Sequence, residues 1–542
     1  KTEVVSLLRR LLREVFNDGG ELAVASSNSA ARVIGGETIH SALKMSAQQP
    51  LSVDKLAKLK VDNDAIDRLS ALEAVIVEEV SMVPSALLGA LSLRLCVARK
   101  KTKGCDPDLY TERGHMFGSV PIVMFLGDFY QLGPVRKGGV RSSLLHRLPN
   151  TAPVHARNGQ RIFLDGVNHA MFLYETHRFV DRLVSPPRPC EFMPAFLQAM
   201  RNGDKLTPEQ REIVRGWLAK PKDPRLADPA MRHGFEMAIG WEAVNRQMQY
   251  RCLREAKEAG QMLLYIQAVD TFKAQLSKEE YMQMLQVVNI NNAGHMLGMC
   301  PIYVGMRVRL TVKISARHGI VQDAAGVVVG VKFHPKEFEG QSDWRENAAH
   351  EAHESGYYRL RYAPRCVLVK FDGHEVDVGF GAGVVQVPIF RANWQFIAHE
   401  IVAGFRLPAK RTVTRYQIPL VPERVRTVQT AQGLGMDAAT MMLAKPANMS
   451  LDDWWLHLYV MLSRARVHHR VVVYDLPPME ILERGPPEYI KEGVRRFESM
   501  MPPSRQLARQ RAREYGWRLG DCTDGAVGAG PGGTTAQSCL LY

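Results

Sequence analysis

Hydrophobic residues along this chain follow two patterns. From Val4 to Phe16 they recur at every third or fourth position, and the pair Gly19-Gly20 follows; this spacing predicts an amphipathic helix with a stop. Short apolar runs without polar alternation come later, at 22–26, 75–77, 122–126 and 471–474. Strands that are buried on both faces have this texture, so the pattern predicts an α/β architecture with a parallel sheet covered by helices.

The pattern changes between Pro301 and Phe390. Valine-rich segments with alternating polar residues, such as VGMRVRLTV and CVLVKF, are separated there by Gly and Asp. This texture predicts a small, barrel-like, all-β insertion. Beyond Pro502 the chain is first arginine-rich, which predicts a helix over 505–518, and then glycine-rich, which predicts disorder over 520–535.

Composition and charge restrict the class of protein. The 542 residues are 46% hydrophobic and allow three or four domains, and no apolar run has the eighteen or so residues that cross a bilayer. The eight cysteines are scattered without metal-ligand spacing, which indicates reduced thiols. A formal net charge of +14 favours a polyanionic partner, with nucleic acid ahead of an acidic membrane surface. The basic run that contains Arg99 is expected to be a solvated charge run.

Two buried strands end in carboxylates. The segment VIVEEVSM ends in Glu78 and Glu79, and FLGDFYQLGPV places Asp128 directly after its strand. Open α/β sheets bind ligands outside the carboxyl ends of their strands. A magnesium nucleotide needs one carboxylate for the water shell of the ion and a second group to position the attacking water, and the two glutamates offer that pair. The alternative is that each carboxylate only ends a strand or caps a helix.

The chain starts with Lys1-Thr2 at the beginning of the first predicted helix. In a phosphate-binding loop of the form GxxxxGK[ST], the final Lys contacts the phosphates and the final hydroxyl contacts magnesium. A Lys-Thr pair on its own is an ordinary surface pair. Its interpretation therefore depends on the motifs that follow.

Taken in order, seven segments resemble the motifs of the petite-integration-frequency (Pif) DNA helicases of superfamily one, over Lys1 to about Asp475. They are KTEVVSLLRRLL, GGETIHSALKM, VIVEEVSMV, FGSVPIVMFLGDFYQLGPV, THRF, TAQGLGMD and LYVMLSRAR. The resemblance implies an ATP-dependent DNA helicase, a motor of two RecA-like domains that moves 5′ to 3′ along single-stranded DNA and unwinds duplex. It places this motor in DNA repair, recombination and telomere maintenance.

The resemblance also implies the domain order. Motor domain 1 would span 1–170 without its first strand and loop glycines, and motor domain 2 would span 171–300 and 391–485. An SH3-like β insertion would occupy 301–390, and 486–542 would be a basic, glycine-rich, disordered tail.

By resemblance, the ATP and Mg²⁺ site consists of residues from both motor domains. Lys1 would contact the phosphates, Thr2 and Glu78 would support magnesium, and Glu79 would orient the hydrolytic water. Gln131 would sense the γ-phosphate, and Arg178 and Arg464 would neutralise charge in the transition state. Gln432 and Gly433 would bind the nucleotide and, with Asp437, link it to the DNA track. The alternatives are a salt bridge between Arg178 and Glu175, and an exposed position of Arg464 on its helix.

The DNA contacts implied by the resemblance are short polar side chains that bind phosphates without reading sequence, namely Ser27, Asn28, Thr38, His40 and Thr427. The implied partners are single-stranded and forked DNA, with no membrane, and the implied state is a monomer. The expected compartment is intracellular and nuclear, with the mitochondrion as the alternative.

The sequence also departs from the family pattern. Glu78 stands where the family usually has Asp, TVQTA lacks a usual His and Lys, and Gly133 replaces a proline. The phosphate-loop glycines would precede Lys1, so we expect the chain to be a fragment that binds ATP poorly. Two other functions remain open: a catalytically decayed relative that binds single-stranded DNA, and the helicase half of a rolling-circle mobile element.

Overall fold

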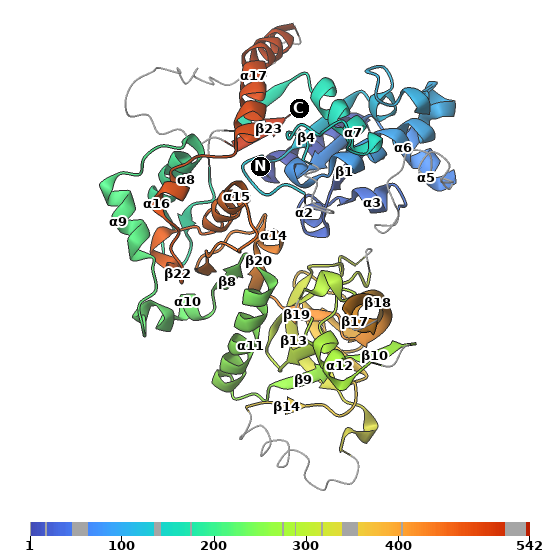
Figure 1. Cartoon of the computed structure of the whole chain (residues 1–542). Coiled ribbons are helices and arrows are strands. Elements are labelled where there is room, and N and C mark those ends of the chain that lie inside the picture. The colour runs from blue at the N-terminus through green and yellow to red at the C-terminus, as the bar shows by residue number, and fades with distance from the viewer. Residues whose placement is uncertain are drawn as a thin grey trace. The chain divides into compact units, whose positions relative to one another are not determined.

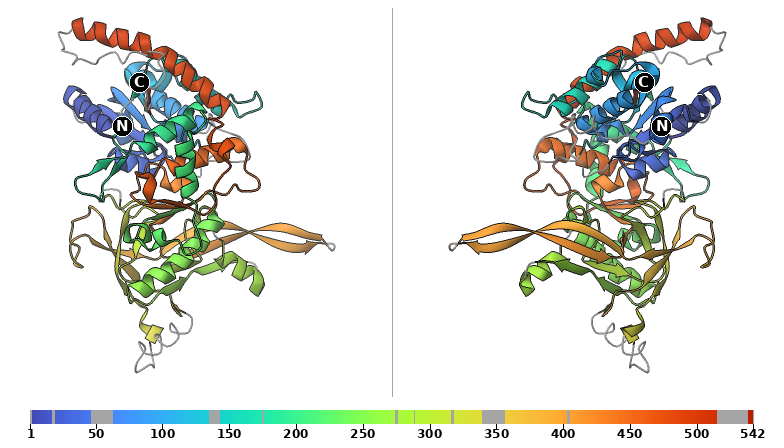
Figure 2. Two further views of the ribbon diagram at one scale, coloured as in Figure 1. Left: turned by 90° about the vertical axis from the view of Figure 1, so that its left-hand side faces the viewer. Right: turned by 90° about the vertical axis from the view of Figure 1, so that its right-hand side faces the viewer.

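The computed structural model describes residues 2–16, 19–45, 63–134, 143–173, 176–273, 276–287, 289–315, 318–338, 356–402, 405–514 and 538–541. The chain folds as two compact units, drawn in Figure 1 and from two further sides in Figure 2. The first unit comprises Lys1–Asp223, Ala431–Ala438 and Leu443–Tyr542, and the second comprises Pro224–Thr430 and Ala439–Met442. In the described part of the chain, none of the helices has the length and apolar character needed to cross a membrane.

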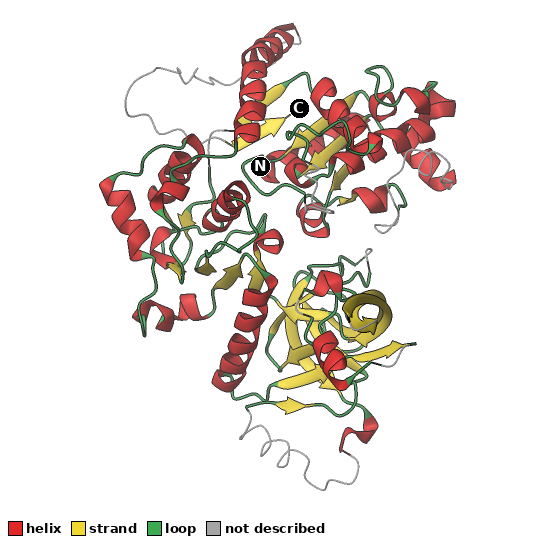
Figure 3. Cartoon of the chain, viewed as in Figure 1, coloured by secondary structure: helices red, strands yellow, loops and turns green. Residues whose placement is uncertain are grey.

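The first unit is built on a six-stranded sheet of order β2-β1-β3-β4-β23-β5. Strands β1 to β4 are parallel, whereas β23 runs antiparallel to β4 and β5. Figure 3 shows these strands with helices around them. The strands are β1 (Glu21–Ala25), β2 (Glu37–Thr38), β3 (Ala74–Glu78), β4 (Ile122–Leu126), β5 (Ala170–Leu173) and β23 (Ser538–Leu541). The predicted parallel sheet is therefore confirmed for β1, β3 and β4.

Both faces of this sheet are covered because its side chains alternate between two apolar layers. Helix α1 (Thr2–Phe16) packs Val5 and Leu12 against one face, together with Ile76 and Met124. On the other face, Phe125 meets Phe163 of α7 (Val154–Gly166), with ring centroids 5.2 Å apart. The remaining helices of this part are α2 (Asn28–Val33), α3 (Ile39–Ala42), α5 (Asn63–Ser70) and α6 (Ser85–Lys103).

The rest of the first unit is mainly helical. It contains α8 (Phe192–Asn202), α9 (Pro208–Gly216), α15 (Leu451–Leu462), α16 (Met479–Leu482), α17 (Glu488–Glu514) and the strands β6 (Val180–Asp181), β7 (Arg188–Pro189) and β22 (Val471–Val473). The prediction of a disordered tail from residue 486 is wrong for α17. Phe497 of this helix stacks on Phe129 with centroids 6.0 Å apart, and such aromatic packing stabilises an ordered helix.

The second unit combines a small parallel sheet with antiparallel β structure. Strand β8 (Phe235–Ala238) pairs in parallel with β20 (Val425–Thr427) and β21 (Ala439–Met442). A five-stranded antiparallel sheet has the order β16-β15-β13-β12-β19. Its strands are β12 (Arg307–Leu310), β13 (Ala325–Lys332), β15 (Cys366–Phe371), β16 (Val384–Pro388) and β19 (Leu420–Pro422). The β structure predicted for residues 301–390 is present in the described part of this region, but its barrel-like, SH3-like character stays a prediction.

The β structure continues past the predicted end of the insertion at residue 390. Strands β17 (Phe390–Val402) and β18 (Phe405–Gln417) pair along their whole length as an antiparallel ribbon, visible in Figure 2. Strand β10 (Val269–Phe272) extends this ribbon to three strands. The other elements of the second unit are α10 (Pro229–Arg232), α11 (Trp241–Glu258), β9 (Leu264–Gln267), α12 (Lys278–Leu285), β11 (Met299–Ile302) and β14 (Tyr358–Arg359). Helix α14 (Val428–Ala431) follows β20.

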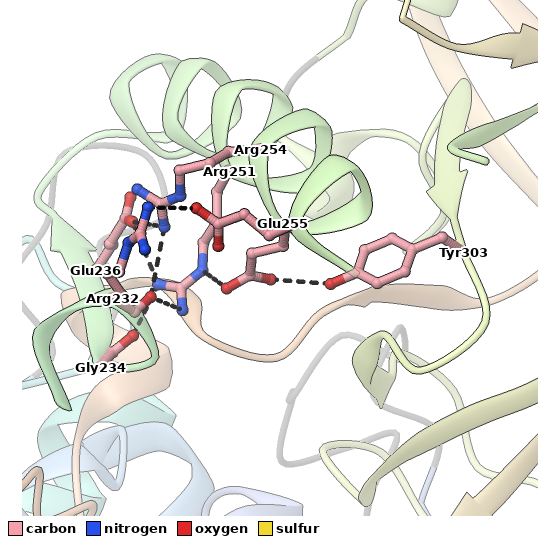
Figure 4. Close-up of polar contacts among 8 residues, drawn as sticks. Arg232, Gly234, Glu236, Arg251, Arg254, Glu255 and Tyr303 are labelled. Atoms are coloured by element: carbon pink, nitrogen blue, oxygen red, sulfur yellow. Dashed lines mark hydrogen bonds and ion pairs between the residues drawn. The ribbon is translucent and has the colours of Figure 1, made fainter. Parts of the chain in front are cut away.

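A charge cluster fastens α11 to β8 in the second unit (Figure 4). Arg251 is buried and donates to Glu255 at 2.8 Å, to Glu236 at 3.2 Å and to the carbonyl of Gly234 at 2.7 Å. The hydroxyl of Tyr303 donates to the second oxygen of Glu255 at 3.1 Å. Burial raises the pKa of Glu236, and Arg251 opposes that rise. Because each buried charge has an opposite partner, the cluster is an anchor between helix and strand.

Arg99 contradicts the expectation of a solvated basic run on α6. It is 1% exposed and donates to the carbonyls of Ser70, Leu72 and Gly118 at 2.8, 2.6 and 2.6 Å. The charge thus satisfies backbone acceptors that lie 19 to 29 residues away.

Arg99→Met is expected to lower the free energy of unfolding of the first unit by about 2–3 kcal/mol, because buried carbonyl groups lose charged donors. The change is measured by urea unfolding. Lys101→Met on the exposed side of the same helix is the control, with an expected change within about 0.5 kcal/mol. Equal stabilities of the two variants would contradict the assigned role of Arg99.

Candidate active site

The two glutamates at the end of β3 lie at the edge of the parallel sheet. Glu78 is the last residue of the strand, with 2% exposure, and Glu79 follows it with 7% exposure. Glu79 has φ 50° and ψ 50°, the left-handed conformation that costs free energy for a residue with a side chain. The fold thus buries two consecutive carboxylates at the edge of the sheet where such sheets bind ligands.

The end of β4 lies beside this pair because Glu78 is in register with Leu126. Gly127 follows, and a Cβ atom there would lie 2.9 Å from a side-chain carbon of Val80, so only glycine fits. Asp128 is buried and accepts from the backbone N–H of Tyr130 at 3.1 Å and from Nε2 of Gln131 at 3.3 Å. In the described part of the chain, Oε1 of Gln131 is buried without a hydrogen-bond donor.

Arg464, from later in the chain, interacts electrostatically with Glu79, and Arg178 lies beside Arg464. Arg178 donates to the carbonyl of Ser463 at 3.4 Å, beside Arg464. Arg464 is 0% exposed and donates to the carbonyl of Val460 at 2.9 Å and to the hydroxyl of Ser463 at 2.7 Å. An exposed position of Arg464 is therefore excluded, whereas the alternative partner of Arg178, Glu175, lies outside the described residues.

The electrostatic environment of Arg178 and Arg464 favours binding of an anion. Burial, together with the charge of Arg178, lowers the pKa of Arg464 to about 9, and Glu79 opposes this shift. The two neighbouring guanidinium groups repel one another, and the buried group of Arg464 has lost hydration. A phosphate group there would offset both costs, since arginine binds phosphate oxygens with paired donors.

The segment around Gln432 lies against the chain that follows α15. The N–H of Met436 donates to the carbonyl of Arg464 at 2.8 Å, and the N–H of Arg466 donates back to Met436 at 2.9 Å. Gly433 has φ 85°, which favours glycine. Gln432 is 8% exposed, and its amide N and O both lack hydrogen-bond partners among the residues that the structure describes. A buried amide of this kind is costly unless a ligand or water satisfies it, so the position fits a polar ligand.

The structure therefore brings together Glu78, Glu79, Gln131, Arg178 and Arg464 within the first unit. Gln432 and Gly433 join them through the pairing of Met436 with the chain after Arg464. Lys1 lies outside the described residues, and Thr2 opens α1. Sequence reasoning missed Arg201, which pairs with Asp128 at 2.8 Å. The only sequence signal for it was an arginine near the end of the otherwise apolar segment FMPAFLQAMRN.

Several of the predicted DNA-binding residues make structural contacts within the fold. Ser27 accepts from Ala30 N–H at 3.3 Å and caps α2, and Thr38 accepts from Ser41 N–H at 3.2 Å and caps α3. Asn28 and His40 are half-buried on these helices. Thr427 is 2% exposed in the second unit and lies 3.2 Å from the hydroxyl of Thr430, which disfavours a direct phosphate contact. DNA binding by these residues stays a prediction.

Comparison with known proteins finds similarity to helicases of the PIF1 type. Residues 1–166 match the family model described as PIF1-like helicase. The ATP-dependent DNA helicase PIF1 of Danio rerio is 24% identical over 461 residues, which cover 84% of this chain and 54% of the relative. The chain thus spans about half the length of that relative.

Two solved structures share the fold. The Pif1 helicase from Candida albicans is 18% identical with a TM-score of 0.54, over 92% of this chain and 93% of the other. The Bacteroides Pif1 helicase in complex with ADP-AlF3 and single-stranded DNA is 15% identical with a TM-score of 0.53, over 92% and 91%.

The fold is therefore the α/β fold of helicases with two RecA-like domains, as predicted. The resemblance to Pif1-type helicases that the sequence motifs indicate is also confirmed. The predicted domain boundaries stay predictions.

Proposed function

We propose that this chain is the motor region of an ATP-dependent DNA helicase that moves 5′ to 3′ on single-stranded DNA and unwinds duplex. The observation that carries the proposal is the approach of Arg464, with Arg178 beside it, to Glu79, which directly follows Glu78 after β3. Carboxylates beside a pair of arginines are the groups that phosphoryl transfer from a nucleotide requires. Similarity to the PIF1 helicases supports the same reading.

ATP with Mg²⁺ is the proposed cofactor, and the described residues fit it. The buried amide of Gln432 and the buried Oε1 of Gln131 both have open hydrogen-bonding capacity in the described part of the chain. Bound ATP supplies the phosphoryl group whose transfer to water drives the motor. Glu78, with Thr2, would support the ion, and Lys1 would contact the phosphates.

Each remaining residue has a separate role in hydrolysis. Glu79 accepts a proton from the attacking water and orients it, and its buried position keeps bulk water away. Gln131 binds the γ-phosphate with its amide. Arg178 and Arg464 stabilise the charge that develops on the transferred group, because their charge is permanent and their donors are planar. Gln432 and Gly433 connect the nucleotide to the elements that follow α15.

DNA is the proposed track and substrate. The net charge of +14 supports binding to a polyanion. The Bacteroides structure with single-stranded DNA and another described as unwinding at forked double-stranded DNA have the same fold, which supports single-stranded and forked DNA as partners. We further propose that the motor acts as a monomer in DNA repair, recombination and telomere maintenance, within the nucleus or the mitochondrion.

A second candidate function is a catalytically decayed relative that retains single-stranded DNA binding. It is favoured by Glu78, whose extra methylene moves the carboxylate that would serve magnesium, and by the altered segment TVQTA. The helicase part of a rolling-circle mobile element remains a third proposal and would require a nickase domain elsewhere in the protein.

The experiment that separates these functions is ATP hydrolysis with and without single-stranded DNA. It is carried out on the 542-residue chain and on the product of the complete coding sequence. Stimulation by DNA in either form supports the helicase. DNA binding without hydrolysis in both forms supports the decayed relative.

A further inference from the structure

Arg201 of α8 occupies an unusual position in the first unit. Its Nη2 donates to Oδ2 of Asp128 at 2.8 Å, and its Nε donates to the hydroxyl of Tyr459 at 2.5 Å. The guanidinium carbon lies 4.7 Å from the ring centroid of Tyr130 and 5.3 Å from that of Tyr459. The side chain is only 12% exposed. Two tyrosine faces and a carboxylate thus hold one arginine.

The charge of this arginine is secured by its neighbours. Burial by itself lowers the pKa of Arg201, but Tyr459 and Asp128 raise it, and the net shift is upward. Asp128, in turn, is buried and needs a cation nearby. Loss of Arg201 would leave this carboxylate without its ion-pair partner.

Arg201 also connects two parts of the candidate active site. Asp128 accepts from Arg201 on Oδ2 and from Nε2 of Gln131 on the same oxygen, at 2.8 and 3.3 Å. Tyr459 lies on α15, the helix that leads to Arg464. A hydrogen-bonded glutamine loses rotational freedom, so Asp128 fixes the amide of Gln131 when Arg201 fixes Asp128.

We propose that Arg201 is a positioning residue for ATP hydrolysis, which is held by Tyr459 and Tyr130 and acts through Asp128 on Gln131. The inference rests on the proposed function, because it assigns Arg201 to the same reaction. A structural role alone would bind α8 to its neighbours and would not depend on Gln131. The two roles therefore differ in how an Arg201 substitution combines with a Gln131 substitution.

The test is a double-mutant cycle on the full chain, in the form that hydrolyses ATP. Arg201→Met is expected to lower kcat at least tenfold while the Kd for a fluorescent ADP analogue stays within threefold. In a Gln131→Ala background, Arg201→Met is expected to lower kcat less than twofold further, because the amide it positions is gone. Arg211→Met on α9 is the matched control. Arg211 forms an ion pair with Glu483 at 2.7 Å, and this pair involves neither Asp128 nor Gln131. Its kcat should stay within twofold of wild type.

A kcat of Arg201→Met within twofold of wild type would overturn the proposal. A double variant whose loss of kcat equals the product of the losses in Arg201→Met and Gln131→Ala would overturn it as well. If Arg201→Met does not fold, Asp128→Asn takes its place in the same cycle with the same expectations, because it removes the link between Arg201 and Gln131. A wild-type chain that hydrolyses no ATP in either form overturns the proposed function itself. Active wild type with an unaffected Arg201 variant overturns the positioning role alone.

Discussion

Glu79→Gln is expected to lower the kcat of ATP hydrolysis by about 10³-fold, while the Kd for ADP changes less than threefold. The substitution keeps the size and the backbone conformation of a buried residue and removes only the proton acceptor. Binding of the nucleotide depends on other groups, so the loss falls on the chemical step. Turnover at saturating ATP and equilibrium binding of a fluorescent ADP analogue measure the two effects separately.

Glu73→Gln is the matched control for this substitution. Glu73 precedes the opposite end of the same strand and pairs with Lys103 at 3.6 Å on a partly exposed surface. Its replacement is expected to leave kcat unchanged, since an exposed ion pair contributes little. Wild-type turnover in Glu79→Gln would remove this residue from the mechanism.

Asp270→Asn is expected to lower the free energy of unfolding of the second unit by about 3–5 kcal/mol. Arg415 donates to both carboxylate oxygens of Asp270, at 2.9 and 2.8 Å, and both side chains are 0% exposed. Arg415 also donates to the carbonyls of Met284 and Met296, each at 3.2 Å. The variant leaves a buried guanidinium without its counter-ion. Urea unfolding and hydrogen exchange in β10, β17 and β18 measure the loss.

Asp372→Asn is the matched control, because it breaks an Arg–Asp ion pair of the same unit that is exposed rather than buried. Arg307 and Asp372 lie 2.7 Å apart with side chains that are 27% and 47% exposed, and we expect a change below about 1 kcal/mol. The double variant Asp270→Leu with Arg415→Met should recover much of the lost stability, because apolar residues often replace a buried ion pair well. Equal urea midpoints for Asp270→Asn and wild type would show that the pair does not stabilise the second unit.

The sequence predicted the elements whose side chains face an apolar layer. Helix α1 and strands β3 and β4 were foreseeable because burial on one or both faces leaves a period in the sequence. The carboxylates at the end of β3 were foreseeable for a related reason, since charged residues directly after a buried strand mark the edge of a sheet. These features depend on local pattern alone.

Other features depend on contacts between distant segments. Arg99 reads as part of a basic run, and only the fold brings its guanidinium to carbonyls 19 to 29 residues away. Arg201 meets Asp128 across 73 residues and Tyr459 across 258, and no spacing in the sequence marks that cluster. The tail helix α17 packs Phe497 against Phe129, a contact between segments that are far apart in the sequence. Side-chain pairing of this kind leaves no periodic signal.

The proposed function requires a motor that is driven by ATP and responds to DNA. The most direct test is the rate of ATP hydrolysis with and without single-stranded DNA, measured on the 542-residue chain and on the product of the complete coding sequence. We expect at least tenfold stimulation by DNA in a form that hydrolyses ATP, and loss of this hydrolysis in Glu79→Gln. Single-stranded DNA binding with no hydrolysis in both forms would contradict the proposed function.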